Sequence, residues 1–314
     1  MTTQSVGSPF SRALKKRLES TRRSFYFLTR SPLATIGLAV VIIYVLIAIV
    51  GPEIVGGNPL IMKQYYLFQG KSIIFNPLPP FKYSQFPLGT TFGGYSIYEG
   101  VIKGARNDLE LASAVVLSGA LIGVVLGSIA GFKGGAIGEV IMRITDIFLS
   151  LPTIVIALAF LTVFGRYENV MIGALIIIWW PTYTRVVRGQ VLTVREQKYV
   201  EASVAAGSSS LRTVIKHIIP NSIYPIFVQM SLDYGNVILT LAALFFLGFT
   251  FAGPGFAEWG NIISAASNST FGGSALYNYP WTITIPGLVI LIFVLSLNLF
   301  GDGLRDVLDP RMRR

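Results

Sequence analysis

The chain has 314 residues, of which 53% are hydrophobic and 13% are charged, and its mean hydropathy is +0.64. This composition is typical of an integral membrane protein and excludes an ordinary soluble domain. The formal net charge is +10, but the basic residues flank apolar runs and form no single face with interleaved aromatics, so nucleic acid is not an expected partner. The chain has no cysteine and His217 is its only histidine, so we expect neither disulfides nor a metal site.

A basic segment precedes the first apolar run. Residues 1–32 carry seven arginines and lysines, and the positive-inside rule therefore predicts a cytoplasmic tail. Residues 33–50 contain no charge and would span roughly 27 Å as a helix, which predicts the first transmembrane helix. Because Gly51-Pro52-Glu53 is a poor cleavage site, we expect this helix to be retained. Residues 51–107 contain six prolines and predict an irregular but packed external loop.

Residues 108–301 form the predicted core, with five further transmembrane helices. The first of them, residues 108–132, carries glycine at every fourth position from Gly119 to Gly131. Small residues at this period let helix backbones approach closely in lipid. We therefore expect this face to pack against another helix of the chain, with a sliding surface during gating as a compatible alternative.

The third predicted span, residues 140–164, carries two charges near its cytoplasmic end. Arg143 and Asp146 are three residues apart on one helix face, so a local ion pair of snorkelling side chains would explain both. An ionisable residue within a span is also a functional candidate, and Asp146 is therefore a candidate for a translocation pathway. Pro152 removes a backbone hydrogen bond and predicts a kink.

A segment of small and charged residues, 195–221, follows the fourth predicted span, 170–185. Helix is favoured up to Ala206, Gly207 suits the C′ position at positive φ, and residues 208–210 offer an N-cap for a second helix that ends before Pro220. The predicted unit is a helix-turn-helix on the cytoplasmic membrane surface. The first helix has a smooth face of small residues with a single acid, which suits close docking of another protein's backbone.

The fifth and sixth predicted spans, residues 222–249 and 281–301, contain further polar side chains. Three of them recur at helical spacing in the fifth span, which Pro225 is expected to interrupt, and they could share one face. Hydrogen bonding between helices is the alternative explanation. The complete set of pathway candidates is Gln229, Asp233, Asn236, Asp146 and Asn298.

Residues 250–280 contain no lysine or arginine, which predicts an external loop, and the basic residues 302–314 predict a cytoplasmic tail. The predicted fold is therefore an all-α integral membrane protein with six transmembrane helices. We expect it to cross the cell membrane several times, with both termini in the cytoplasm.

Five sequence blocks in a fixed order resemble the dipeptide/oligopeptide (nickel) permease C family of ABC importers. Within residues 195–221, the order Glu201-Ala202-Ser203, Gly207 and Pro220 resembles the EAA loop of that family. Residues 88–106 depart from the family pattern, with Thr91, Tyr95 and Ser96 at its acidic and arginine positions. The blocks are LGTTFGGYSIYEGVIKGAR (88–106), MRITDIFLSLP (142–152), TRVVRGQVLTVRE (184–196), KHIIPN (216–221) and PGLVILIFVLSLNLFGDGLRDVLDPR (286–311).

The resemblance implies the type I ABC importer permease fold, in which residues 195–221 form a coupling helix that sits in a groove of an ATPase subunit. It also implies a second permease subunit of the B type, two ABC ATPase subunits, an external solute-binding protein and membrane lipid as partners. Glu258 and Trp259 would lie near the external gate and contact the binding protein. The implied ATPase-coupling residues are Glu201, Ala202, Ser203, Gly207 and Pro220.

The sequence carries no GxxxxGK[ST] motif and no nucleophile-base-acid constellation. We therefore predict a transport subunit that is not an enzyme and has no cofactor of its own, with ATP and Mg²⁺ on the partner ATPases. The resemblance implies di- and oligopeptides as substrates, with oligosaccharides or nickel chelates as alternatives. An ion-coupled secondary carrier, in which Asp146 and Asp233 bind the coupling ion, is the alternative from a different class.

Overall fold

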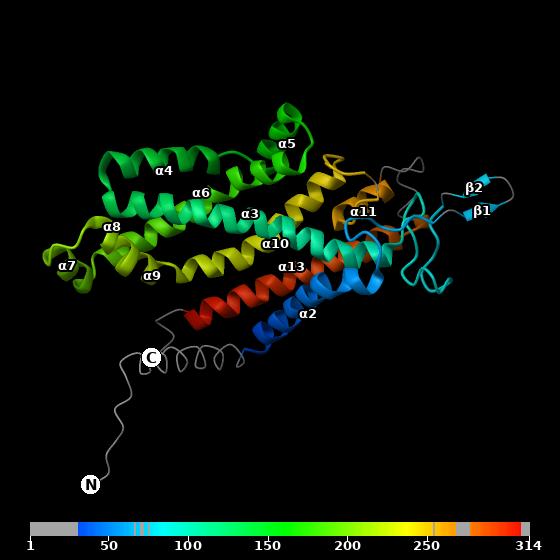
Figure 1. Cartoon of the computed structure of the whole chain (residues 1–314), viewed down its shortest axis with the longest axis horizontal. Helices are drawn as coiled ribbons and strands as arrows, with labels where there is room; N and C mark the ends of the chain where they lie inside the picture. The colour runs from blue at the N-terminus through cyan, green and yellow to red at the C-terminus, as the bar shows by residue number, and fades with distance from the viewer. Residues whose placement is uncertain are drawn as a thin grey trace, which may run out of the picture.

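The computed structural model of the chain is an elongated bundle of long helices (Figure 1). It describes residues 31–65, 67–69, 72–74, 76–253, 255–267 and 277–308. Most of the predicted tail 1–32 and the last six residues of the predicted tail 302–314 therefore lie outside the described residues. The long helices are α2 (Pro32–Val55), α3 (Ile97–Lys133), α4 (Gly135–Leu149), α5 (Thr153–Phe164), α6 (Glu168–Arg195), α10 (Tyr224–Phe246) and α13 (Trp281–Leu308).

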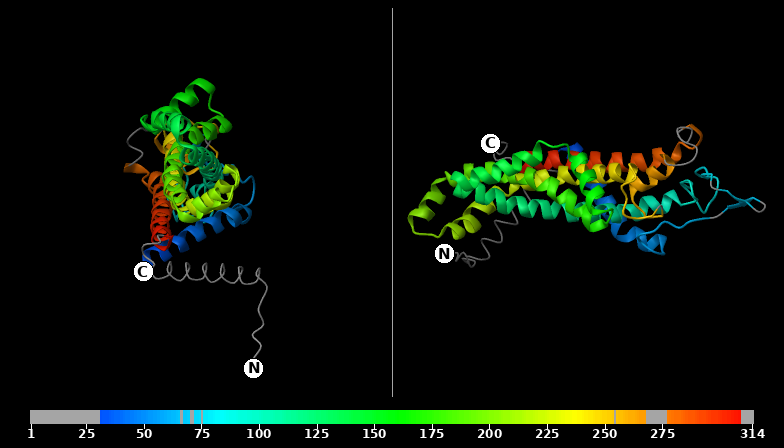
Figure 2. Two further views of the ribbon diagram at one scale, coloured as in Figure 1. Left: turned by 90° about the vertical axis from the view of Figure 1, so that its left-hand side faces the viewer. Right: turned by 90° about the horizontal axis from the view of Figure 1, so that it is seen from above.

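Short elements gather at the two ends of the bundle (Figure 1). One end carries the helices α7, α8 and α9 with a π-helical turn, and the other carries α11 and a two-stranded antiparallel hairpin in which Leu67 pairs with Ile74. Seen from above, α7 to α9 project beyond the other helices (Figure 2). Their bounds are α7 (Lys198–Ala205), α8 (Ser210–Thr213), the π-helical turn (Val214–Ile218), α9 (Ile219–Ser222), α11 (Trp259–Ser267), β1 (Leu67–Gln69) and β2 (Ser72–Ile74).

Five described helices are long and apolar enough to span a membrane: α2, α3, α6, α10 and α13. A sixth span is available if α4 and α5, which meet at 88°, count as one broken span. Apolar side chains such as Ile36, Leu46 and Leu121 are exposed on these helices, as expected for surfaces that face lipid. The helical content and the number of spans agree with the predicted all-α membrane fold.

Several predicted helix boundaries were wrong. α3 begins at Ile97 rather than at residue 108, because the Ser96 hydroxyl accepts a hydrogen bond from the Glu99 N–H and caps an earlier start. α13 continues past residue 301 to Leu308. Pro225 lies in the first turn of α10, where its missing N–H has no partner to lose, so it does not interrupt that helix.

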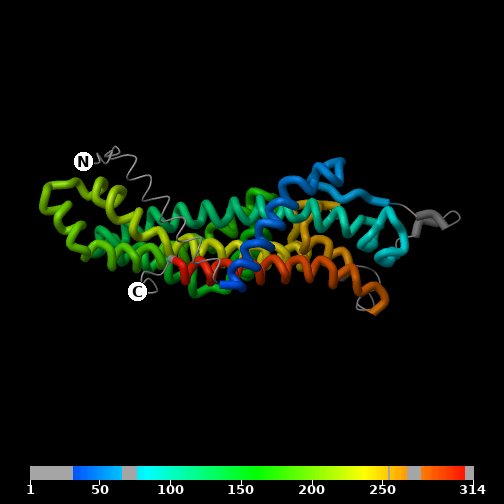
Figure 3. The backbone as a smooth tube through the Cα atoms, turned by 90° about the horizontal axis from the view of Figure 1, so that it is seen from below, coloured from blue at the N-terminus to red at the C-terminus, as the bar shows by residue number. Residues whose placement is uncertain are grey.

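The glycine stripe of α3 packs against α6, as the sequence predicted. A Cβ atom added at Gly127 would lie 2.7 Å from the Thr184 carbonyl oxygen, and one added at Gly131 would lie 2.7 Å from the Val191 Cβ. Both distances are too short for a real contact, so only glycine permits this helix spacing. On the opposite side of the bundle, α2 crosses obliquely and contacts α13 and α3 (Figure 3).

The break between α4 and α5 occurs at Pro152, which precedes α5 in an extended conformation at ψ 125°. The predicted kink is therefore a complete interruption of the helix, with a bend of 88°. Proline cannot donate the backbone hydrogen bond that would continue α4, which explains the position of the break. Residues on both sides of this break line a cavity together with Asp233.

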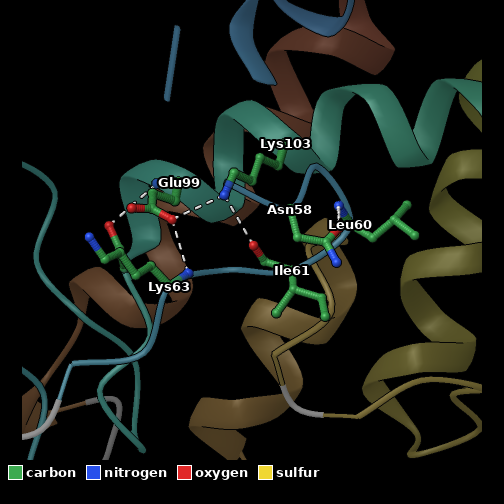
Figure 4. A network of polar contacts seen from close by, with 7 residues as sticks. Asn58, Leu60, Ile61, Lys63, Glu99 and Lys103 are labelled. Atoms are coloured by element: carbon green, nitrogen blue, oxygen red, sulfur yellow. Dashed lines mark hydrogen bonds and ion pairs between the residues drawn. The ribbon is translucent and has the colours of Figure 1, made fainter. Parts of the chain in front are cut away.

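The segment between α2 and α3 is held to the bundle by a buried polar network (Figure 4). Lys103 Nζ lies 3.2 Å from Glu99 Oε2 and donates to the Ile61 carbonyl oxygen at 3.1 Å. The same Glu99 oxygen accepts a hydrogen bond from the Lys63 N–H at 2.9 Å. The Lys103 side chain is only 2% exposed, so this charge is satisfied entirely within the chain. Two side chains of α3 thus bind the backbone of the predicted loop and hold it against the bundle.

Candidate functional site: the coupling segment and the Asp233 cavity

The coupling segment, residues 198–222, contains the predicted turn. After α7, the N–H of Ser208 donates to the Ser203 carbonyl at 3.2 Å, and the N–H of Gly207 donates to the Val204 carbonyl at 2.9 Å. These two bonds form a Schellman motif, which requires the left-handed φ of +80° found at Gly207. Ser209 caps the next helix by accepting from the Arg212 N–H. The predicted C′ glycine and serine N-cap are both confirmed.

The predicted helix end before Pro220 was wrong. A π-helical turn, Val214–Ile218, leads directly into α9, and Pro220 lies in the first turn of α9. The proline removes one backbone donor at this junction, where the π-helical turn changes the hydrogen-bond spacing of the helix. The chain therefore stays helical up to Ser222 and enters α10 after Ile223.

The surface of the coupling segment is open. Glu201, Ala202 and Pro220 are exposed and Ser203 is half-buried, while Val200 is buried and ties α7 to the bundle. Apolar side chains are also exposed here, with Leu211 at 70% and Ile215 at 58%. Figure 2 shows this segment at the front when the bundle is viewed along its axis. A small-residue helix beside exposed apolar groups has the chemistry of a protein-binding surface.

Three of the pathway candidates meet in one site on α10. Gln229 Nε2 donates to Asp233 Oδ2 at 3.1 Å, and Asn236 Nδ2 lies 3.5 Å from Asp233 Oδ1. Asp233 is only 4% exposed, whereas Asn236 is exposed. These side chains share one helix face, as predicted, and Tyr183 and Trp179 of α6 also face the Asp233 carboxyl group.

Asp233 and Asn236 line a cavity of about 440 Å³ beside the break between α4 and α5. The sequence analysis missed most of the other walls, because they come from α4, α5 and α6, which are remote in sequence from α10, whereas Thr240 lies on α10 itself. In the sequence, the only indication of these wall residues was the presence of aromatic and hydroxyl side chains close to Pro152 and in the fourth predicted span. The additional lining residues relevant here are Phe148, Leu151, Thr153, Trp179, Thr182 and Thr240.

Asp146 and Asn298 do not line this cavity. Asp146 forms an ion pair with Arg185 of α6, and Arg143 pairs with Glu139 at 3.4 Å, so the predicted local pair of Arg143 and Asp146 was wrong. The reason is tertiary, since α6 brings a guanidinium to Asp146 that sequence spacing could not indicate. Asn298 lies half-buried on α13.

Glu258 and Trp259 are buried, with exposed fractions of 0%. The Trp259 indole donates to the Val101 carbonyl at 3.0 Å, and the Trp259 N–H donates to Asp108 Oδ2 at 3.2 Å. Glu258 accepts from the Asn261 N–H at 2.6 Å and caps α11. Since neither side chain reaches the surface, the predicted contact with a binding protein was wrong for this conformation. Both residues instead fix α11 to α3.

Glu258 also faces the carboxyl group of Asp108, and Glu258 Oε1 and Asp108 Oδ1 have no other hydrogen-bond partner among the described residues, so the two groups can share a hydrogen bond. Such a bond needs a proton on one of the two carboxyl groups. Burial raises the pKa of Glu258 to about 7, and the N–H groups of Gly260 and Asn261 oppose that shift. The sequence analysis did not single out Asp108, because it stood at the expected edge of a span and its partner lies in a distant loop.

Among the described residues, no group of three or more histidine, cysteine, aspartate or glutamate side chains could hold a metal ion. The arrangement offers a docking surface at one end and a polar cavity within the bundle.

Comparisons with known proteins give the family. Residues 123–314 match the family described as binding-protein-dependent transport system inner membrane component. The chain is 36% identical over 293 residues to the dipeptide transport system permease protein DppC of Alkalihalophilus pseudofirmus, covering 93% of this chain and 90% of that one. It is 34% identical over 300 residues to the oligopeptide transport system permease protein OppC of Bacillus subtilis, covering 96% and 92%.

A solved structure of the MetNI methionine ABC transporter in an inward-facing conformation shares the fold, with a TM-score of 0.52 and 17% identity over 67% of this chain and 97% of that chain. Together with the family match, this confirms the predicted type I permease fold and a multi-pass location in the cell membrane. It also favours a transport subunit over both an enzyme and the alternative of an ion-coupled carrier. The chain belongs to the family of binding-protein-dependent transport system inner membrane components, as a permease subunit of an ABC importer.

Proposed function

We propose that this chain is one of two membrane subunits of an ATP-driven importer of di- or oligopeptides. The observation that carries the proposal is the exposed coupling segment at one end of the bundle, with Glu201 and Ala202 on its surface. The names of its relatives as dipeptide and oligopeptide permeases support the peptide substrate. The partners are a second permease of the B type, two ATPases that bind ATP and Mg²⁺, and an external solute-binding protein.

The coupling segment and both termini face the cytoplasm in this proposal. Basic residues gather near the coupling segment, where Lys133, Arg188 and Arg195 end or precede spans. The residues 250–280 at the opposite end contain no lysine or arginine. α2 begins and α13 ends on the side of the bundle toward α7 to α9, which supports a common side for both termini (Figure 1).

The coupling segment joins the two helices that flank the Asp233 cavity. α7 follows α6, which contributes Trp179 and Thr182, and α9 precedes α10, which contributes Asp233. Closure of the ATPases would displace the coupling segment, and the displacement would pass directly to α6 and α10. Because the glycines of α3 pack closely against α6, α3 and α6 would move together. The opening of the cavity would then alternate between the two sides of the membrane.

The test is affinity purification of the tagged chain, co-expressed with its partners, in mild detergent. The variant is Gly207→Pro, since proline cannot adopt φ +80° and cannot donate to the Val204 carbonyl. The matched control is Gly248→Pro at the opposite end of α10, where φ is also +80° and the N–H donates to Phe245 at the same 2.9 Å.

We expect the ATPases to co-purify with the wild type and with Gly248→Pro, and to be lost with Gly207→Pro. ATP hydrolysis stimulated by the loaded binding protein should follow the same pattern. Equal recovery of the ATPases with both variants would show that they dock elsewhere.

A further inference from the structure

The carboxylate of Asp233 lacks a cationic partner. None of the four ion pairs within the described residues includes it. Its neighbours are neutral donors: the side-chain amides of Gln229 and Asn236, and Tyr183 and Trp179 of α6. Of the other buried acids of the described chain, Glu99 meets Lys103, while Asp108 and Glu258 face each other and can share one proton. A buried carboxylate that is held only by neutral donors can still bind a cation from outside the chain.

We propose that Asp233 binds the N-terminal ammonium group of a peptide during its passage through this subunit. This inference rests on the proposed function and assigns the recognition step to one residue. The two amides orient the carboxylate toward the cavity, and an ammonium group would complete its hydrogen bonds with a charge-assisted contact.

The cavity suits an organic cation better than a bare ion. Its volume of about 440 Å³ lies within the range of roughly 300–1,000 Å³ that is usual for small-molecule sites. Phe148, Leu151 and Trp179 supply apolar walls, while the hydroxyl groups of Thr153 and Thr182 supply polar positions. A metal ion would need several oxygen or nitrogen ligands, and the described residues offer no cluster of three such acidic, histidine or cysteine side chains.

The cavity is accessible from the surface of this chain. Asn236 is exposed at its edge, and Leu151 at the break between α4 and α5 is 50% exposed. The break, where α4 and α5 meet at 88°, contributes Leu151 and Thr153 to the cavity wall. A peptide could therefore reach Asp233 without unfolding a helix, and its apolar side chains would meet the apolar walls.

The experiment measures peptide binding to the purified complex of the full chain and its partners in lipid nanodiscs, without ATP or binding protein. The probes are trialanine and N-acetyl-trialanine, which differ in the amine alone. Their binding is followed by saturation-transfer NMR on the alanine methyl groups. The variants are Asp233→Asn, which keeps the size and one oxygen of the side chain, and the double variant Asp233→Asn/Asn236→Asp, which returns an acid to the neighbouring position.

We expect trialanine to bind the wild type about 10-fold or more tightly than N-acetyl-trialanine, because a charged hydrogen bond is lost with the amine. Asp233→Asn should weaken the binding of trialanine by a similar factor and leave the binding of N-acetyl-trialanine unchanged. The double variant should restore part of the difference in affinity between the two peptides. The control Glu139→Gln, an exposed acid on α4 outside this cavity, should bind both peptides as the wild type does.

Equal binding of the two peptides to the wild type, or trialanine binding that Asp233→Asn leaves unchanged, overturns the inference. So does the absence of measurable binding at millimolar peptide. These outcomes are separate from a failure of the proposed function, which shows as missing ATPases in the purification and does not depend on Asp233.

Discussion

The end of the bundle that carries α11 buries charged groups, whereas the end that carries α7 to α9 exposes apolar ones. At the α11 end Lys103 is 2% exposed and Glu258 has no exposed surface, and both find their partners within the chain. At the other end Leu211 and Ile215 are exposed at 70% and 58%. Apolar side chains such as Phe81, at 86%, are exposed at the α11 end as well, so the difference between the two ends is that only the α11 end buries charged groups. We propose that a partner covers the exposed surface of the coupling end.

This difference separates what holds the subunit together from what connects it to other chains. Damage at the α11 end should reduce stability, because a buried charge would lose its partner. Damage at the coupling end should reduce assembly and leave stability nearly intact, because the affected side chains contact little of the chain.

The largest expected effect is that of Lys103→Met. The substitution keeps the length of the side chain but leaves Glu99 buried without its cation, and we expect a loss of about 3–5 kcal/mol in the free energy of unfolding. Thermal unfolding in detergent measures it. The control Arg106→Met removes the exposed partner of Glu110 on the same helix and should change little. A similar melting temperature for both variants would show that the buried network does not stabilise this end.

Glu258→Gln should change the pH dependence of stability. The pKa of Glu258 is raised from 4.5 to about 7, so between these values the folded chain keeps a proton that the unfolded chain has released. Stability should therefore fall as pH rises from about 4.5 to 7. The variant cannot lose that proton and should show a flatter profile of melting temperature against pH. The exposed Glu110→Gln control should keep the wild-type profile.

The mildest test uses cysteine as a probe, since the chain has none of its own. Ala202→Cys lies on the exposed face of α7, while Ala257→Cys lies at 0% exposure beside α11. We expect a maleimide to label Ala257→Cys about 100-fold or more slowly, because the reaction there requires local opening. Bound ATPase should protect Ala202→Cys alone. Rapid labelling of both positions would mean that the α11 end is not closed.

Sequence reasoning succeeded where the cause of a structure is local. The turn after α7 followed from Gly207 and Ser209, whose conformation and cap depend on neighbours within five residues. The site on α10 followed from helical spacing, which brings Gln229 and Asn236 to Asp233 on one face. Pro152 indicated the break, though its angle of 88° depends on how α5 packs.

Sequence reasoning failed where the contacts of a side chain depend on a residue remote in sequence. Asp146 meets Arg185 across 39 residues, and Trp259 binds Asp108 and Val101 across some 150 residues of chain. No periodicity or motif encodes such pairs, and a conspicuous Glu258-Trp259 in an external loop therefore suggested an exposed contact when the fold had buried it.

The sequence by itself determined the membrane-spanning helices, the coupling turn and the polar face of α10, because hydrophobic length, glycine conformation and helical period act over short distances. Only the tertiary structure decided which charges are buried, which buried acids lack a cationic partner and where a cavity lies. Those properties depend on the desolvation and packing of groups brought together from separate helices, and their energies exist only once the bundle has formed.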